Sequence, residues 1–278
     1  MTGQSQMLGL ERGFTAGISF LHRRSARPAG SLILLHGIGS NARSFSALAA
    51  ALPAEIDVIA WNAPGYADST PLAVATPAPR HYADALARFL DALNLSRVAL
   101  AGHSLGALFA ASFAANYPDR VAQLALVSPA LGYGVAAGGK LPATVQSRID
   151  EIVELGSAAF AKKRAARLVG DPTARPDIVA AVEQAMASVN VRGYVQAAHA
   201  LGAGHLLADA ALIKAPAVVA VGALDQITPP ENARRAYAAL PRALGFSEIP
   251  GAGHALPQEQ PAALASFLAE TIGIFAHV

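Results

Sequence analysis

Short apolar runs that alternate with helix-forming stretches constrain the fold of this chain more than any other feature of its sequence. Five such runs are typical of buried parallel strands: "SLILLHG", "DVIAWNAPG", "RVALAGHS", "VAQLALVSP" and "APAVVAVGALD". A sixth run, "GFSEIPGAGH", is weaker. Helical patterns separate most of these runs, as in "SFSALAAAL", "RHYADALARFLDALNL", "LGALFAASFAANYP" and "PPENARRAYAAL". The sequence therefore predicts an α/β protein with a mostly parallel central sheet and helices on both faces.

The alternation stops after a Gly-rich linker, "LVSPALGYGVAAGGK". From about Leu141 to Ile213 the chain contains helix-forming segments, separated by Gly and Pro, and no convincing strand. We therefore predict that residues 131–213 form a helical lid, inserted into a core that comprises residues 1–130 and 214–278.

The composition excludes several classes of protein. Of the 278 residues, 53% are hydrophobic and 14% are charged, which favours a large buried core over disorder. The net charge of +2 is too small for the basic stripe that nucleic-acid binding needs, so no nucleic-acid partner is expected. A local basic cluster, "KKRAAR" at residues 162–167, is interpreted as a solvated lid face, with an anion site as the alternative. There is no cysteine and no H-E-x-x-H or similar ligand set, so neither a metal nor another cofactor is expected.

The sequence also bears on where the protein works. The first residues, "MTGQSQMLGLERGFTAGISF", lack the basic start and apolar centre of a secretory signal. No apolar run reaches the roughly 18 to 20 residues that a membrane helix requires. We expect a soluble cytoplasmic protein that does not bind membranes.

The motif most informative about chemistry is Gly102-His103-Ser104-Leu105-Gly106, which fits G-x-S-x-G between a predicted strand and a predicted helix. In that context the two glycines allow a sharp turn that lifts the Ser104 hydroxyl above the edge of the sheet. The free N–H groups at the start of the following helix point toward charge that develops near the serine. Ser104 is therefore the candidate nucleophile.

A serine nucleophile needs a histidine base and a carboxylate that orients the histidine. Asp225 closes the run "APAVVAVGALD", and His254 follows the last predicted strand. Because ligands sit at the carboxyl ends of parallel strands, we expect both side chains to meet Ser104. The backbone N–H groups of Leu105 and Ile38 are the candidate donors of an oxyanion hole. An ordinary Gly-rich turn is the alternative for the "HGIGS" segment that contains Ile38.

Five further residues are candidate substrate contacts. Phe160 and Tyr194 lie in the predicted lid and would line an apolar pocket. Arg192 would pair with a substrate carboxylate, with a solvated arginine as the alternative. His36 and His103 stand at strand ends, where each is either a substrate contact or a hydrogen-bonded structural histidine.

Five stretches of the chain, in this order, resemble the α/β-hydrolase superfamily: "LLHGIGSNARSF", "WNAPGYADS", "AGHSLGALFAASFAANYPDRVAQLALVSP", "VGALDQITPP" and "IPGAGHALPQEQP". The resemblance covers nearly all of the chain outside the predicted lid. It implies the α/β-hydrolase fold, with Ser104 as nucleophile, His254 as base and Asp225 as orienting acid. These are the same three residues that the strand ends indicate.

Within the superfamily, the chain resembles the branch that holds 3-oxoadipate enol-lactonases, meta-cleavage product hydrolases and haloperoxidase-like esterases. The phrase "VRGYVQAAHAL" is similar to one in lactonase-like members, whereas Ala255 stands where meta-cleavage product hydrolases usually carry Trp. Asn62 and Ala67 also depart from the Asp and Gly of many relatives. The resemblance implies a serine hydrolase that cleaves a small ester or (enol-)lactone through an acyl-enzyme.

Two other functions stay open at this point. One is a C–C bond hydrolase that acts on a diketone from ring cleavage, and the other is a weakly catalytic ligand receptor on the same fold. Fold alone does not choose among them. A homodimer is suggested only by the general frequency of such assemblies.

Overall fold

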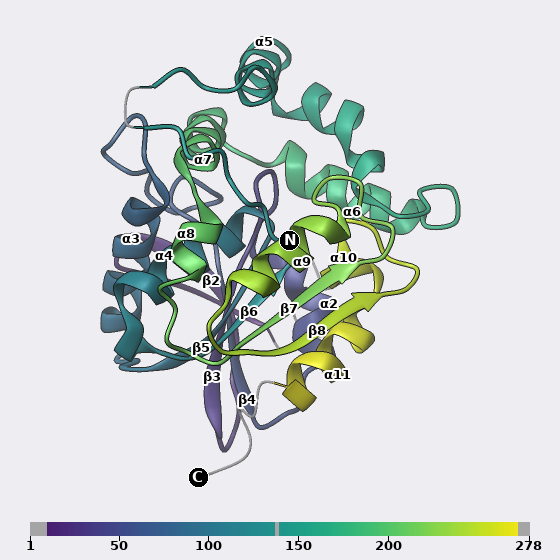
Figure 1. The fold of residues 1–278 in the computed structure, drawn as a ribbon. Coiled ribbons are helices and arrows are strands. Elements are labelled where there is room, and N and C mark those ends of the chain that lie inside the picture. The colour runs from purple at the N-terminus through teal and green to yellow at the C-terminus, as the bar shows by residue number, and fades with distance from the viewer. Residues whose placement is uncertain (1–9, 137–138, 272–278) are drawn as a thin grey trace.

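The six apolar runs form strands β3 to β8 of an eight-stranded sheet in the computed structural model, which describes residues 10–136 and 139–271 (Figure 1). The spatial order is β1-β2-β4-β3-β5-β6-β7-β8. Strands β3 to β8 pair in parallel, which confirms the predicted sheet, while β1 and β2 are antiparallel to their neighbours. The strands are β1 (Glu11–Thr15), β2 (Ile18–Arg23), β3 (Gly30–Leu35), β4 (Ile56–Trp61), β5 (Val98–His103), β6 (Val121–Val127), β7 (Ala217–Gly222) and β8 (Ala243–Ile249).

The hairpin of β1 and β2 was not predicted from the sequence. Its turn consists of Ala16 and Gly17, which have φ values of 50° and 77°. Two-residue hairpin turns of this kind usually carry Asn or Asp before the Gly, so the turn lacks the usual sequence signal. The prediction that the chain lacks a secretory signal was based on its first twenty residues, and residues 1–9 of these lie outside the described residues.

Helices cover both faces of the sheet, because successive strand residues point to opposite sides. In β3, Ile33 and Leu35 pack in one apolar cluster with α3, α4, α8 and α9, while Leu32 and Leu34 pack in another with α2, α10 and α11. The helices of this core are α2 (Ser46–Ala51), α3 (Pro79–Ala92), α4 (Leu105–Asn116), α8 (Leu206–Ala210), α9 (Pro230–Ala239), α10 (Leu256–Glu259) and α11 (Pro261–Thr271), with 3-10 turns η1 (Ala42–Phe45) and η2 (Pro118–Arg120).

A helical segment lies between β6 and β7, which are neighbours in the sheet. It comprises α5 (Ala143–Arg164), the 3-10 turn η3 (Ala165–Leu168), α6 (Pro176–Ala187) and α7 (Val191–Ala203). Figure 1 shows α5, α6 and α7 gathered at the top, over one end of the sheet. The sequence predicted two helices in this range, and α5 is divided at Gly156, whose φ of 72° and ψ of 165° are not helical. The lid boundaries at residues 131 and 213 stay a prediction, and α8 within that range packs on α4 and α9.

Over the described ranges, no helix combines the length and the apolar character needed to cross a bilayer.

The turn between β5 and α4 brings three backbone segments into close contact. A Cβ atom on Gly106 would lie 2.1 Å from the carbonyl oxygen of Leu35 in β3. A Cβ atom on Gly102 would lie 2.3 Å from the carbonyl oxygen of Gly106 itself. Only glycine fits at both positions, so the two glycines of the motif are steric requirements for seating α4 against β3.

We expect Gly106→Ala to lower the free energy of unfolding by about 1 to 3 kcal/mol, because the added methyl group must displace the backbone of β3. Urea unfolding followed by circular dichroism measures the change. A variant as stable as the wild-type chain would contradict the close approach of α4 to β3.

Candidate active site

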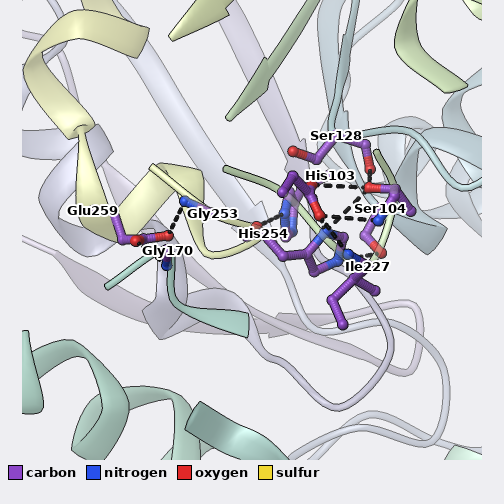
Figure 2. A network of polar contacts seen from close by, with 10 residues as sticks. His103, Ser104, Ser128, Gly170, Ile227, Gly253, His254 and Glu259 are labelled. Carbon is purple, nitrogen blue, oxygen red and sulfur yellow. Dashed lines mark hydrogen bonds and ion pairs between the residues drawn. The ribbon is translucent and has the colours of Figure 1, made fainter. Parts of the chain in front are cut away.

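The carboxyl ends of three parallel strands bring Ser104, Asp225 and His254 into one hydrogen-bonded chain. Ser104 follows β5, Asp225 follows β7 and His254 follows β8. The Ser104 hydroxyl lies 2.9 Å from His254 Nε2, and His254 Nδ1 lies 2.9 Å from Asp225 Oδ2. All three residues are buried, and Figure 2 shows Ser104 and His254 pointing toward one another. The structure therefore brings the three side chains within hydrogen-bond distance, as expected from their places at the ends of parallel strands.

Ser104 has an unusual backbone conformation, with φ 55° and ψ −116°. A positive φ on a residue with a Cβ costs energy and persists only when the surroundings hold it. The surroundings do so here: the Ser104 N–H donates to the carbonyl of Val127, and its carbonyl accepts from Ala107 and Ala130. The turn is thus fixed from both β6 and α4, which holds the hydroxyl toward His254.

Asp225 is placed to remain ionised beside the imidazole. Burial by itself raises the pKa of Asp225, but the neighbouring His254 and N–H donation from Thr228 and Ile227 outweigh burial, and the pKa lies below its ordinary value. An ionised carboxylate accepts the Nδ1–H of the imidazole and leaves Nε2 free to accept the serine proton. The chain from Ser104 to Asp225 is therefore arranged for removal of a proton from the serine hydroxyl.

Thr228 is a member of this network that the sequence analysis missed. Its hydroxyl oxygen lies 2.9 Å from the carbonyl of Ser128, 3.0 Å from Asp225 Oδ2 and 3.1 Å from His254 Nδ1. A hydroxyl carries one proton, so it donates to only one of the two oxygens. The available signal was local: a threonine three residues after an aspartate favours a turn in which the carboxylate accepts the threonine N–H.

Two residues of the cavity lining carry backbone N–H groups without a protein acceptor in the described residues. Ile38 follows β3 and Leu105 is the first residue of α4, and both line the cavity that Ser104 and His254 line. In the part of the chain that the structure describes, neither N–H donates to a protein acceptor. The first N–H groups of a helix have no partner within it, which explains Leu105. The pair is available for an oxygen that acquires negative charge beside Ser104.

His36 and His103 lie outside the cavity lining and have structural partners. His36 Nδ1 donates to the carbonyl of Gly37 and its Nε2 accepts from the N–H of Ala63. His103 Nε2 donates to the carbonyl of His254 over 2.7 Å. Burial lowers the pKa of His36 to about 4 and, with the nearby His254, the pKa of His103 to about 3. Both rings are neutral at pH 7, and neither is brought to the substrate side of Ser104.

The cavity above Ser104 has a volume of about 320 Å³. Phe160 and Tyr194, both predicted as substrate contacts, are among its lining residues, and their rings pack edge to face with centroids 5.2 Å apart. Arg192 is exposed and does not line the cavity, because it lies on the solvent side of α7. Two members of the basic cluster, Arg164 and Arg167, do line it, although the cluster was interpreted as a solvated face.

Across residues 10–136 and 139–271, no cluster of three His, Asp or Glu side chains is arranged to hold a metal ion.

Glu259 connects the helical segment between β6 and β7 to the loop that carries His254. One carboxylate oxygen accepts the N–H of Gly170, after η3, and the other accepts the N–H of Gly253, each over 2.8 Å (Figure 2). Burial raises the pKa of Glu259 above its ordinary value, although both hydrogen bonds act in the opposite direction. Gly253 precedes His254 directly, so this buried carboxylate helps to hold the histidine loop in place.

We expect Glu259→Gln to lower the free energy of unfolding by about 1 to 3 kcal/mol, because an amide cannot accept from both N–H groups and leaves one of them unsatisfied. Urea unfolding measures the loss. Glu231→Gln, at an exposed position of α9, is the control and should change stability by less than about 0.5 kcal/mol. Equal stability of the two variants would argue against the bridging role of Glu259.

The two buried histidines predict a dependence of stability on pH. Their folded-state pKa values lie below the ordinary value of 6.5, so below that pH the unfolded chain binds protons that the folded chain does not. Stability should therefore fall as the pH drops below about 6.5, by about 1.4 kcal/mol per pH unit for each histidine. Urea unfolding between pH 7 and pH 5 measures the slope. His103→Gln removes one of the two histidines and should reduce the slope by about 1.4 kcal/mol per pH unit. An unchanged slope would show that His103 does not cause the dependence of stability on pH.

Comparison with known proteins identifies the family of this chain. The family model described as serine aminopeptidase, S33, matches residues 26–261. The pimeloyl-[acyl-carrier protein] methyl ester esterase of Chromobacterium violaceum is 30% identical over 228 residues, which cover 81% of this chain and 87% of that protein.

Solved structures share the fold. The malate-bound thermophilic esterase from Thermogutta terrifontis has a TM-score of 0.82 at 24% identity, over 94% of this chain and 98% of the other. The enol-lactonase from Burkholderia xenovorans LB400 has a TM-score of 0.82 at 21% identity, over 94% and 99%. At these identities the structural likeness establishes the architecture only. Together with the family match, it shows that the chain is an α/β hydrolase and belongs to the family described as serine aminopeptidase, S33.

Proposed function

We propose that the chain is a serine hydrolase that cleaves a small carboxylic ester or lactone through an acyl-enzyme. The observation that carries the proposal is the 2.9 Å contact between the Ser104 hydroxyl and His254 Nε2 at a cavity where two backbone N–H groups have no acceptor within the described residues. Nucleophile, base and oxyanion donors then surround one position for a carbonyl group, as acyl transfer requires.

The reaction follows from these roles. As Ser104 Oγ bonds to the carbonyl carbon, its proton passes to His254 Nε2, and Asp225 stabilises the imidazolium that forms. The carbonyl oxygen becomes an oxyanion that accepts from the N–H groups of Ile38 and Leu105. Collapse breaks the bond to the leaving alkoxide, which takes the proton from His254. Water then attacks the acyl-enzyme with His254 again as base, and the acid product and free Ser104 result.

Ester or lactone chemistry is favoured over removal of amino-terminal residues from peptides. An aminopeptidase must hold a positively charged α-amino group, for which a carboxylate is the natural partner. The cavity lining includes four arginines and, among the described residues, no Asp or Glu. That lining repels an ammonium group. The curated relative from Chromobacterium violaceum, named as a methyl ester esterase, supports the same choice.

A series of p-nitrophenyl esters from short to long acyl chains tests the proposal. We expect turnover by the wild-type chain and a fall of at least about 10,000-fold in kcat for Ser104→Ala, as when the nucleophile of a serine hydrolase is removed. The chain-length optimum reports the size of the cavity.

Equal rates in both proteins would exclude Ser104 as nucleophile. If neither protein hydrolyses any ester, the ester proposal fails. Turnover of a vinylogous diketone would then identify a C–C bond hydrolase, and tight binding without turnover would identify a receptor.

A further inference from the structure

Four arginines line the cavity beside Ser104 and His254. Arg148 and Arg164 lie on α5, Arg167 lies in η3, and Arg235 lies on α9. The first three come from the helical segment between β6 and β7, and the fourth comes from the core. No described Asp or Glu side chain is a member of the lining, so the charged groups that face this space all carry the same sign.

The charges of these arginines are mostly uncompensated. Arg164 pairs with Glu151, but Glu151 also pairs with Lys163, so one carboxylate serves two cations. Arg148, Arg167 and Arg235 form no ion pair within the described residues. Cations gathered at one cavity repel one another, and an anion bound among them relieves that repulsion.

The arginines differ in depth. Arg148 and Arg164 are half-buried, while Arg167 and Arg235 are exposed. The Arg164 guanidinium lies over the Phe160 ring, 4.8 Å from its centroid, and Phe160 packs against Tyr194. Arg148 and Arg164 both act to lower the pKa of Tyr194, against burial, which raises it, so both charges lie near this cavity-lining phenol. Arg148 and Arg164 therefore belong to the inner wall, and the two exposed arginines belong to the outer part of the cavity.

We infer that the substrate carries a carboxylate in addition to the reacting ester or lactone carbonyl, and that Arg148 and Arg164 bind this carboxylate beside Ser104. This inference rests on the proposed function, because it assigns the substrate class of the same site. Guanidinium groups present paired N–H donors that match the two oxygens of a carboxylate. Arg167 and Arg235 attract the anion at the outer part of the cavity, where a single exposed charge contributes less.

Matched ester pairs test the inference. In the first pair the charge is in the acyl part: the mono-p-nitrophenyl ester of adipic acid is compared with the same compound methylated at its other carboxyl group. In the second pair the charge is in the leaving group: 4-carboxyphenyl butyrate is compared with its methyl ester. We expect the wild-type chain to prefer the anion in at least one pair, and the preference to shrink as salt is raised.

The arginine variants show which side chains cause the preference. Arg148→Gln should lower kcat/KM for the preferred anionic ester by about tenfold or more, as for loss of a hydrogen bond to a charged group. Arg167→Gln and Arg235→Gln should lower it by about two- to fivefold, as for exposed charge pairs. Each variant should lower kcat/KM for the anionic ester more than kcat/KM for its matched neutral ester. Arg192→Gln removes an exposed arginine of the lid outside the cavity and is the matched control, with no change expected for either ester.

The outcomes separate this inference from the proposed function. If the wild-type chain cleaves neutral and anionic esters equally in both pairs, or if the preference survives in Arg148→Gln, Arg167→Gln and Arg235→Gln alike, the carboxylate site is wrong while Ser104-dependent hydrolysis stands. If no ester is cleaved, calorimetric titration of adipate into the wild-type chain and Arg148→Gln decides. Binding that weakens in the variant supports the site, and no binding overturns it. Tighter binding of inorganic phosphate than of adipate would overturn the choice of a carboxylate.

Discussion

The close approach of three backbone segments at the turn between β5 and α4 is the constraint on which the rest of the site depends. Gly106 sits against the carbonyl of Leu35 in β3, and Gly102 of β5 sits against the carbonyl of Gly106, so a side chain at Gly106 would push α4 away from β3 and one at Gly102 would push α4 away from β5. With α4 seated there, Ser104 adopts its positive φ and its hydroxyl points to His254. Leu105, the first residue of α4, and Ile38, which follows β3, both line the cavity. The strain at Ser104 is thus held by packing that the glycines make possible.

His36, His103 and His254 lie at or after the ends of parallel strands, and their surroundings differ. His36 is enclosed between the carbonyl of Gly37 and the N–H of Ala63, and His103 donates to the carbonyl of His254. Burial without a carboxylate partner keeps both rings neutral. His254 alone has a carboxylate, Asp225, at Nδ1 and a serine hydroxyl at Nε2. The neighbouring groups, rather than the position in the sheet, separate the candidate base from the structural histidines.

The helical segment supplies most of the charged side chains that line the cavity. The core contributes Ser104, His254 and the backbone donors, which suit a reacting carbonyl of any ester or lactone. The segment contributes Phe160 and Tyr194 as an apolar wall and three of the four arginines. Glu259 links the two parts through Gly170 and Gly253, so the wall that carries these arginines is tied to the loop that carries His254. The candidate catalytic groups and most of the arginines thus come from different parts of the chain, which share one cavity.

The sequence by itself determined the parallel sheet, the helices on both faces and the three strand-end residues Ser104, Asp225 and His254, because these depend on local periodicity and on chain order. The N-terminal hairpin escaped prediction because its Ala-Gly turn has no strong local signal, whereas Gly156 does interrupt α5 between the two helices that the sequence predicted. Only the tertiary structure decided which arginines face the cavity. Helical spacing shows that a residue lies on some face of a helix, but the packing of α5 and η3 brought Arg164 and Arg167 to the cavity and left Arg192 outside it. Thr228 and Glu259 likewise acquired their roles through partners distant in the chain, Ser128 and Gly170, which only the folded chain brings within hydrogen-bond distance.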